Sequence, residues 1–210
     1  MFDAVIFDLD GTLIDTEAHN QAAGSEAFAR HGITVEPSFL HRLIGQDDET
    51  STTLVRATFP TLDIRAFRDC WAGAVMRNYA AGIPLKPGAS SLLSRINLPK
   101  ALATSSTREQ ADHKLVLTGL LPFFLHTVTV NDVKRAKPAP DAYLLSARLL
   151  GVAPARCLVF EDSELGAEAA QAAGMTVVQV PDILPVSGRY ATLVAPDLLT
   201  GARQIGLLPD

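Results

Sequence analysis

Side chains that can do chemistry follow several short apolar runs of the chain, at the point where each run ends. They are Asp8 and Asp10 after the run 4–7, Thr104 and Ser105 after 101–103, Lys137 shortly after 127–130, and Glu161 and Asp162 after 158–160. In an open parallel sheet, ligands bind beyond the carboxyl ends of the strands. If these runs are parallel strands, acids, hydroxyls and a lysine therefore converge on one edge.

The aspartates define the chemistry that such an edge could do. Asp8, Asp10 and Asp162 offer oxygen ligands, and Mg²⁺ suits a few carboxylates together with substrate phosphate and water. Asp8 can attack the phosphorus of a bound phosphoryl group, because the cation and a lysine cancel the charge repulsion. Asp10 can protonate the leaving oxygen and later deprotonate water. The pattern predicts phosphoryl transfer with Mg²⁺ as cofactor.

The hydroxyl and lysine side chains fit the same reaction. Thr104 or Ser105 can donate a hydrogen bond to a phosphoryl oxygen, and Lys137 can stabilise the charge of the transition state. Each motif alone also has a plain structural interpretation, because Asp-Gly pairs form turns and acidic or hydroxyl residues cap helices. Their joint occurrence at four strand ends favours the catalytic interpretation.

The order of the runs predicts the architecture. The short apolar runs, typical of strands buried on both faces of a parallel sheet, lie at 4–7, 101–103, 127–130, 158–160, 176–180 and 191–194. Helical spacing between them is expected to bury Ala111, Leu115 and Leu117 in segment 108–119, and Ala142, Leu145 and Leu149 in segment 139–150. Strands alternating with helices predict an α/β fold with a Rossmann-like parallel sheet core.

Segment 15–82 breaks the alternation, because it shows helical spacing without convincing strands. The sequence Pro84-Leu85-Lys86-Pro87-Gly88 then predicts a stiff return to the sheet. We expect residues 1–14 and 83–210 to form the α/β core, with 15–82 as a small helical domain inserted after the first strand.

Four motifs together resemble the haloacid dehalogenase superfamily. Residues 8–12, Asp-Leu-Asp-Gly-Thr, resemble its DxDGT signature, and Thr104 ends a strand as its second motif does. Residues 137–141 resemble KPxPD, and residues 161–166 resemble EDSxxG. The insertion resembles the helical cap of the branch that contains phosphoglycolate phosphatases, β-phosphoglucomutases and sugar-phosphate phosphatases.

The resemblance implies a phosphoaspartyl intermediate on Asp8. It also implies that Mg²⁺ is held by the side chains of Asp8 and Asp162 and the backbone carbonyl of Asp10, with Glu161 at or near the metal. Asp10 is lacking in the dehalogenase members, so its presence disfavours dehalogenation. The absence of lysine from 15–82 removes the phosphonoacetaldehyde hydrolases, which use a lysine there.

Mutase activity is disfavoured but stays an alternative. The mutase relatives carry a histidine on the first cap helix and an arginine in a cap loop, whereas His19 is one place off and the loop 45–50 has no arginine. A mutase must also bind a second phosphate, which this acidic loop would repel. Hydrolysis of a small-molecule phosphate ester is therefore expected.

The substrate is expected to have a neutral, hydroxylated far end, as in a sugar or polyol phosphate. Asp47, Asp48 and Glu49 would repel an anionic group. The candidate substrate contacts are Thr12, Ser105, His19, Asn20 and Gln46. The rival is a carboxylated, phosphoglycolate-type substrate bound by one of the arginines of 15–82, which are Arg30, Arg42, Arg56, Arg65, Arg68 and Arg77.

Composition excludes other classes of protein. With 210 residues, 48% of them apolar, the chain can bury a sizeable core, and its net charge of −5 is mixed along the sequence, which disfavours nucleic acid as a partner. No apolar stretch is long enough to span a bilayer, and Asp3 and Asp8 do not fit a signal peptide. We expect a cytoplasmic monomer with free cysteines.

Two other classes of protein share parts of this pattern. A receiver-like signalling module also phosphorylates an aspartate, but its acid follows a middle strand, whereas Asp8 follows the first. A non-catalytic binding protein is not favoured, because all the chemical residues are present.

Overall fold

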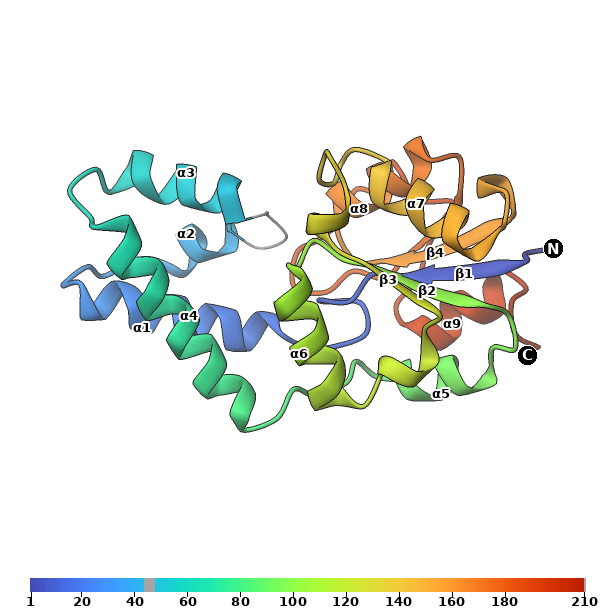
Figure 1. Cartoon of the computed structure of the whole chain (residues 1–210), viewed down its shortest axis with the longest axis horizontal. Helices are drawn as coiled ribbons and strands as arrows, with labels where there is room; N and C mark the ends of the chain where they lie inside the picture. Colours follow the sequence, from blue (N-terminus) through green and yellow to red (C-terminus); the bar gives the residue numbers. More distant parts are fainter. Residues whose placement is uncertain (44–47, 210) are drawn as a thin grey trace. The chain divides into compact units, whose positions relative to one another are not determined.

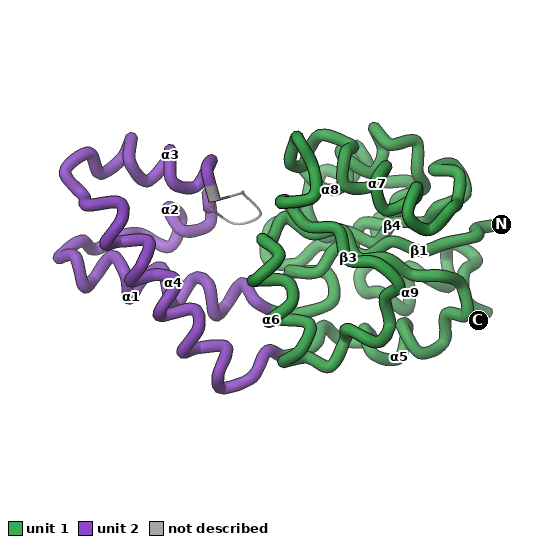
Figure 2. Tube along the Cα trace, in the orientation of Figure 1, with its two compact units in different colours: residues 1–15, 84–210 green, residues 16–83 purple. Residues whose placement is uncertain are grey.

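The computed structural model describes residues 1–43 and 48–209 of the chain. The chain divides into two compact units, one made of residues 1–15 and 84–210 and the other of residues 16–83 (Figure 2). These boundaries lie one residue after those drawn from the sequence. We refer to the two parts as the sheet unit and the helical unit.

The sheet unit is built on a six-stranded parallel sheet with the strand order β3-β2-β1-β4-β5-β6 (Figure 1). The strands are β1 (Ala4–Phe7), β2 (Lys100–Ala103), β3 (His126–Val128), β4 (Cys157–Glu161), β5 (Thr176–Gln179) and β6 (Leu193–Val194). The strand order turns back at β1, which lies between β2 and β4. The α/β fold with a parallel, Rossmann-like sheet is confirmed.

Among the strand ends that differ from the sequence prediction, two lie near the candidate site residues. The strand expected over 127–130 ends at Val128, because Asp132 accepts hydrogen bonds from the backbone and hydroxyl of Thr129 and folds residues 130–132 into the 3₁₀ helix η2 (Val130–Asp132). At the other site strand, Glu161 is the last residue of β4 and not the first after it.

The centre of the sheet is fully buried. Every residue of β1 and β4 is inaccessible to solvent, as expected for central strands of a parallel sheet. The rings of Phe7 and Phe160 stack across these strands with centroids 5.2 Å apart. Since Phe7 pairs with Phe160 in the register, Asp8 and Glu161 follow side by side at the carboxyl edge.

Helices cover both faces of the sheet (Figure 1). Those of the sheet unit are α5 (Ala89–Arg95), α6 (Arg108–Thr118), α7 (Asp141–Leu150), α8 (Glu164–Ala172) and α9 (Leu198–Gln204), with 3₁₀ turns η1 (Leu121–Phe123) and η3 (Pro154–Arg156). Helices α7 and α8 pack together on one face, and α5 packs with α9 on the other.

The buried faces of two helices differ from the prediction. Helix α7 buries Ala142, Tyr143, Ser146 and Ala147, whereas Leu149 is exposed and Leu145 only partly buried. In α6, Ala111 and Leu115 are buried as predicted, but Leu117 is exposed.

The helical unit contains α1 (Glu17–Arg30), α2 (Pro37–His41), α3 (Asp48–Thr58) and α4 (Ile64–Ala80), and its described residues include no strand. Helices α1 and α4 pack along each other. Phe28 lies at the centre of an aromatic cluster, with its ring centroid 4.5 Å from that of Phe67. Gly24 allows the close packing, because a Cβ there would lie 2.9 Å from Trp71.

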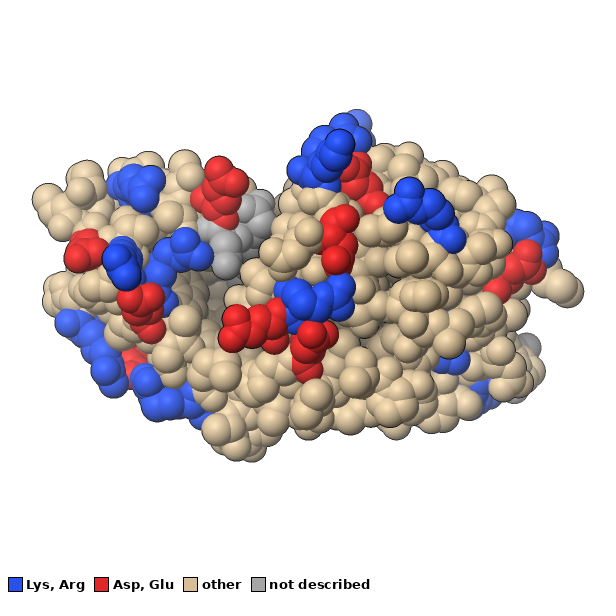
Figure 3. Space-filling model, in the orientation of Figure 1, with Lys and Arg blue, Asp and Glu red and all other residues tan. Residues whose placement is uncertain are grey.

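Two surface properties bear on the predicted partners. Figure 3 shows Lys and Arg side chains interspersed with Asp and Glu side chains over the face in view. Within the described residues, no helix has the length and apolar character needed to cross a membrane.

Candidate active site

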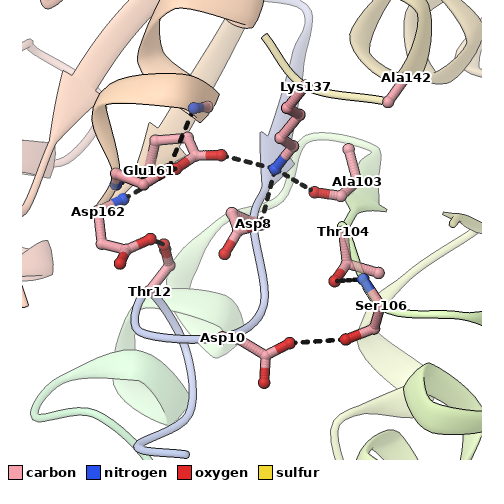
Figure 4. Close-up of polar contacts among 12 residues, drawn as sticks. Asp8, Asp10, Thr12, Ala103, Thr104, Ser106, Lys137, Ala142, Glu161 and Asp162 are labelled. Atoms are coloured by element: carbon pink, nitrogen blue, oxygen red, sulfur yellow. Dashed lines mark hydrogen bonds and ion pairs between the residues drawn. The ribbon is translucent and has the colours of Figure 1, made fainter. Parts of the chain in front are cut away.

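A buried lysine joins the ends of three strands at the carboxyl edge of the sheet (Figure 4). The Nζ atom of Lys137 donates hydrogen bonds to Oδ1 of Asp8 at 2.7 Å, to Oε1 of Glu161 at 2.6 Å and to the carbonyl of Ala103 at 3.0 Å. The side chains of Lys137, Asp8 and Glu161 are 6%, 9% and 0% exposed. The predicted lysine and acids therefore meet in one buried ionic cluster.

Glu161 is held on both of its carboxylate oxygens. Oε1 also accepts a hydrogen bond from the hydroxyl of Tyr143 at 2.7 Å, while Oε2 accepts from the backbone N–H of Asp162 and from the N–H and hydroxyl of Ser163. Gly166 makes room for this carboxylate, because a Cβ there would stand 1.7 Å from Oε1. Glu161 therefore fixes the position of the Lys137 ammonium group, and its carboxylate also lies within the group of acids that could hold a metal ion.

Asp162 lies beside the turn that follows β1. Its Oδ1 accepts a hydrogen bond from the buried hydroxyl of Thr12 at 3.2 Å, and a Cβ on Gly11 would stand 2.4 Å from its Oδ2. The positive φ of Gly11, 82°, also requires glycine. The DGT turn thus sets the position of Asp162, and Thr12 supports that carboxylate.

Burial and crowding of carboxylates raise two acidic pKa values. Burial, with help from the Glu161 and Asp10 carboxylates and against the opposing Lys137, raises the pKa of Asp8 to about 7. Burial and the neighbouring Glu161 and Asp8 raise the pKa of Asp162 well above its usual value. Burial favours neutral Lys137, but Asp8 and Glu161 outweigh it and hold the pKa of this lysine well above normal.

These carboxylates fit a hard cation. Among the described residues, Asp8, Glu161 and Asp162 each bring a carboxylate oxygen within 4.8 Å of the others. All the donors are oxygens, which Mg²⁺ prefers, and a cation would stabilise the charged forms of Asp8 and Asp162, which burial and the neighbouring carboxylates disfavour. The set could bind a metal, as the sequence predicted.

Asp10 contacts a separate pair of residues, Lys114 in α6 and Ser106 just before it, and Figure 4 shows the Ser106 contact. Its Oδ2 accepts a hydrogen bond from Ser106 at 2.9 Å, and its Oδ1 accepts one from Lys114 at 2.6 Å. The hydroxyl of Thr104 is buried and accepts from the backbone N–H of Ser106, whereas Ser105 is half-buried. Sequence reasoning did not assign roles to Ser106 or Lys114.

Two candidate substrate residues of the helical unit, His19 and Asn20, contact Tyr79 of the same unit. The hydroxyl of Tyr79 donates to Oδ1 of Asn20 at 3.3 Å, and its ring centroid lies 5.9 Å from that of His19. Nδ1 of His19 is buried without a hydrogen-bond partner among the residues that the structure describes. Gln46 lies outside the described residues.

The charged residues of the helical unit that bear on substrate choice are exposed where the structure describes their side chains. Asp47 lies outside the described residues, as does the side chain of Asp48, while Glu49 is exposed. The arginines of the helical unit are all exposed, and they are Arg30, Arg42, Arg56, Arg65, Arg68 and Arg77.

Comparison with known proteins agrees with this geometry. The family model of haloacid dehalogenase-like hydrolases matches residues 2–174. The chain is 38% identical over 180 residues to hexitol phosphatase A of Escherichia coli, covering 83% of this chain and 81% of that protein. It is 33% identical over 180 residues to fructose-1-phosphate phosphatase YqaB of the same organism, covering 84% and 95%.

A solved structure is similar to this chain over nearly its whole length. A putative β-phosphoglucomutase from Thermotoga maritima superposes with a TM-score of 0.80 at 28% identity, covering 97% of this chain and 99% of the other. Fold and site thus define a phosphoric monoester hydrolase. The chain belongs to the haloacid dehalogenase-like hydrolases, in their β-phosphoglucomutase-like branch, and the resemblance to this superfamily seen in its motifs is confirmed.

Proposed function

We propose that the chain is a Mg²⁺-dependent phosphatase of a small sugar or polyol phosphate, with Asp8 as the nucleophile. The observation that carries this proposal is the contact of Lys137 with both Asp8 and Glu161 at the end of β1. It combines a buried nucleophilic carboxylate with a fixed positive charge at the place where a phosphoryl group would dock.

The reaction is proposed to run in two displacements. A carboxylate oxygen of Asp8 attacks phosphorus while the ester P–O bond breaks, and Asp10 gives a proton to the leaving oxygen. Water then attacks the phosphoaspartate, Asp10 takes the proton of that water, and inorganic phosphate leaves. Throughout, Lys137 stabilises the negative charge on phosphoryl oxygens, with Thr104 as a further hydroxyl at this edge.

Mg²⁺ would be held by the side chains of Asp8 and Asp162 and the backbone carbonyl of Asp10, with Glu161 close by, and when bound it supplies charge neutralisation for phosphoryl transfer. Glu161 already uses both oxygens within the protein, so we assign it chiefly to the orientation of Lys137. Removal of the cation with a chelator should abolish turnover, and readdition of Mg²⁺ should restore it.

Two observations support a sugar or polyol phosphate as the substrate. The relatives that match over most of the chain are named for hexitol phosphates and fructose 1-phosphate, which carry hydroxyl groups at the far end. The segment 45–50 of the helical unit carries Asp47, Asp48 and Glu49 but no arginine, and these charges disfavour a substrate with a second anionic group.

The test compares kcat/KM for hexitol phosphates, fructose 1-phosphate, glycerol phosphate and phosphoglycolate, measured as release of inorganic phosphate. We expect the neutral, hydroxylated substrates to be preferred. A preference for phosphoglycolate would reject this substrate class in favour of an arginine-bound carboxylate. Isomerisation of a sugar phosphate without release of phosphate would instead identify a mutase.

A further inference from the structure

A buried lysine that the proposed chemistry does not use lies against Asp10. The side chain of Lys114 is 8% exposed, and its Nζ donates to Oδ1 of Asp10 at 2.6 Å. The same Nζ donates to the hydroxyl of Ser106 at 2.9 Å, and that hydroxyl donates to Oδ2 of Asp10 at 2.9 Å. Lys114 and Ser106 thus hold one oxygen each of this carboxylate and also contact each other.

Ser106 lies just before helix α6 and Lys114 lies in its second turn, and the position of this helix is well fixed. Ser106 directly precedes the N-cap Thr107, which forms a capping box with Gln110. Ala111 and Leu115 anchor the helix with fully buried side chains. Lys114 lies on the same side as these two residues, so the helix directs its ammonium group to the interior.

The arrangement restricts the carboxylate that must move a proton. A carboxylate on a free side chain samples several rotamers, whereas proton transfer needs one orientation within hydrogen-bond reach of the reacting oxygen. A buried ammonium group is stabilised only where acceptors surround it, and here those acceptors are Asp10 and Ser106. The position of the Lys114 ammonium group is therefore fixed, and its hydrogen bond fixes the orientation of the Asp10 carboxylate.

We propose that Lys114 and Ser106 form a clamp that orients Asp10 for proton transfer, with Lys114 as a positioning residue for general acid–base catalysis. The inference rests on the proposed function, because it needs Asp10 as the acid and base of the phosphatase reaction. Lys114 itself acts only through Asp10 and does not contact the phosphoryl group.

The clamp has a signature that a merely structural lysine lacks. When an alkyl phosphate reacts, the P–O bond to the leaving group breaks and the leaving oxygen takes the proton of Asp10. When acetyl phosphate reacts, the leaving group departs as acetate, which is stable without that proton. Loss of the clamp should therefore slow the first displacement for the alkyl ester much more than for the acyl phosphate.

The experiment measures kcat/KM, which reports the first displacement, for the best sugar phosphate and for acetyl phosphate. Lys114→Met should lower kcat/KM for the sugar phosphate by about 10- to 100-fold and for acetyl phosphate by less than about threefold. Lys114→Arg should recover part of the loss. The matched control is Lys100→Met, because Nζ of Lys100 also donates two hydrogen bonds, but to the carbonyls of Ile96 and Leu98.

Two further measurements separate orientation from other roles. Asp10→Asn should show the same selectivity between the sugar phosphate and acetyl phosphate, and adding Lys114→Met to it should cause no further loss. In an Asp8→Asn background, Lys114→Met should leave the affinity for the sugar phosphate unchanged. Equal losses for both substrates, a further loss in the double variant, or weakened substrate binding would each overturn the clamp.

Failure of the clamp and failure of the proposed function are distinguishable. If the wild-type protein hydrolyses sugar phosphates and Asp8→Asn abolishes this, the proposed function stands, and a Lys114→Met variant with wild-type kinetics overturns the clamp alone. If the wild-type protein releases no phosphate from any ester, the function and the clamp are rejected together.

Discussion

At Asp8, the surroundings oppose the charged form of the group that we propose as the nucleophile. Its side chain is 9% exposed, and the pKa is raised to about 7, chiefly by burial. Without a cation, Asp8 in the folded protein therefore holds a proton below about pH 7. A metal that binds there must displace this proton, so metal affinity and pH are coupled.

The affinity for Mg²⁺ should fall as the pH is lowered through about 7. Below this pKa, each pH unit should weaken binding about tenfold or more, because a proton on Asp8 competes with the cation. Isothermal titration calorimetry at about pH 6 and about pH 8, in buffers of different ionisation enthalpy, measures both the affinity and the protons released. An affinity that is the same at both pH values would contradict the raised pKa.

The stability of the metal-free protein should show the same coupling with the opposite sign. The folded pKa of Asp8, about 7, lies above its ordinary value of 3.8. The contribution of this group to stability is therefore fully present below about pH 4 and is lost as the pH rises through about 7. Mg²⁺ should consequently raise the Tm more at about pH 8 than at about pH 6, as measured by calorimetry.

Asp8→Asn should reduce phosphate release by about 10³-fold or more, because an amide oxygen does not form the phosphoaspartyl bond. Asp112→Asn is the matched control, since Asp112 is an exposed acid on α6. Circular dichroism should show both variants folded. Comparable turnover of the two variants would remove Asp8 from the role of nucleophile.

Among the helices, α8 approaches the site more closely than its sequence suggests. Gly166 lies in the first turn of α8, and a Cβ there would stand 1.7 Å from Oε1 of Glu161. The carboxylate cannot retreat easily, because Lys137 and Tyr143 donate to the same oxygen. This glycine therefore serves packing and not backbone conformation.

Gly166→Ala should destabilise the protein by about 1–3 kcal/mol through overpacking and should also reduce activity by displacing Glu161. Gly73→Ala in α4 is the control, because a Cβ at Gly73 meets only the end of Arg77 at 3.4 Å. The control should stabilise its helix by up to about 1 kcal/mol. Urea unfolding of the two variants measures these opposite signs, and equal values would reject the packing argument.

The strands, though not all of their ends, could be predicted because continuous apolar runs mark central strands of a parallel sheet, and polar residues then follow at a common edge. The rotation of each helix about its own axis, which decides the residues that it buries, was harder to predict from the sequence. Leu149 was expected inside α7, but the structure buries Tyr143, whose hydroxyl has its partner in Glu161, 18 residues further along. Local periodicity holds no information on so distant a partner.

The role of Lys114 was missed although a signal was present. Only apolar residues were used to mark the buried side of α6, and Lys114 stands three residues after Ala111 and directly before Leu115. A lysine on the apolar side of a helix needs a buried acceptor. Asp10 is that acceptor, but its proximity depends on the tertiary fold.

In the molecule as a whole, the chain leaves and re-enters the sheet unit at neighbouring points. Ile14 pairs with Leu85 in an antiparallel bridge, and the backbone N–H of Asp15 donates to the carbonyl of Pro84 at 2.9 Å. A further backbone hydrogen bond joins Lys86 to Leu13. The sheet unit therefore does not need the intervening residues to bring these two ends together.

Replacement of residues 16–83 by a short Gly-Ser linker should leave a sheet unit that folds cooperatively and binds Mg²⁺. Closure of a short loop between ends that already pair costs little entropy. Thermal unfolding followed by circular dichroism, with and without Mg²⁺, measures this, and a molten or aggregated product would contradict it. We expect the shortened protein to lose discrimination between sugar phosphates while it still cleaves acetyl phosphate.

Because the two ends are paired, the helical unit is inserted into the sheet unit at a single junction. Asp15 and Pro84 are hydrogen-bonded to each other, so the residues between them can be exchanged as one segment. Asp8, Lys137 and Glu161 all lie in the sheet unit, which such an exchange leaves intact. At such a junction, the unit that selects the substrate can be exchanged while the residues of the proposed reaction stay in place. Chimaeras that carry the helical unit of another protein at this junction should therefore keep the cleavage step and acquire a different substrate preference.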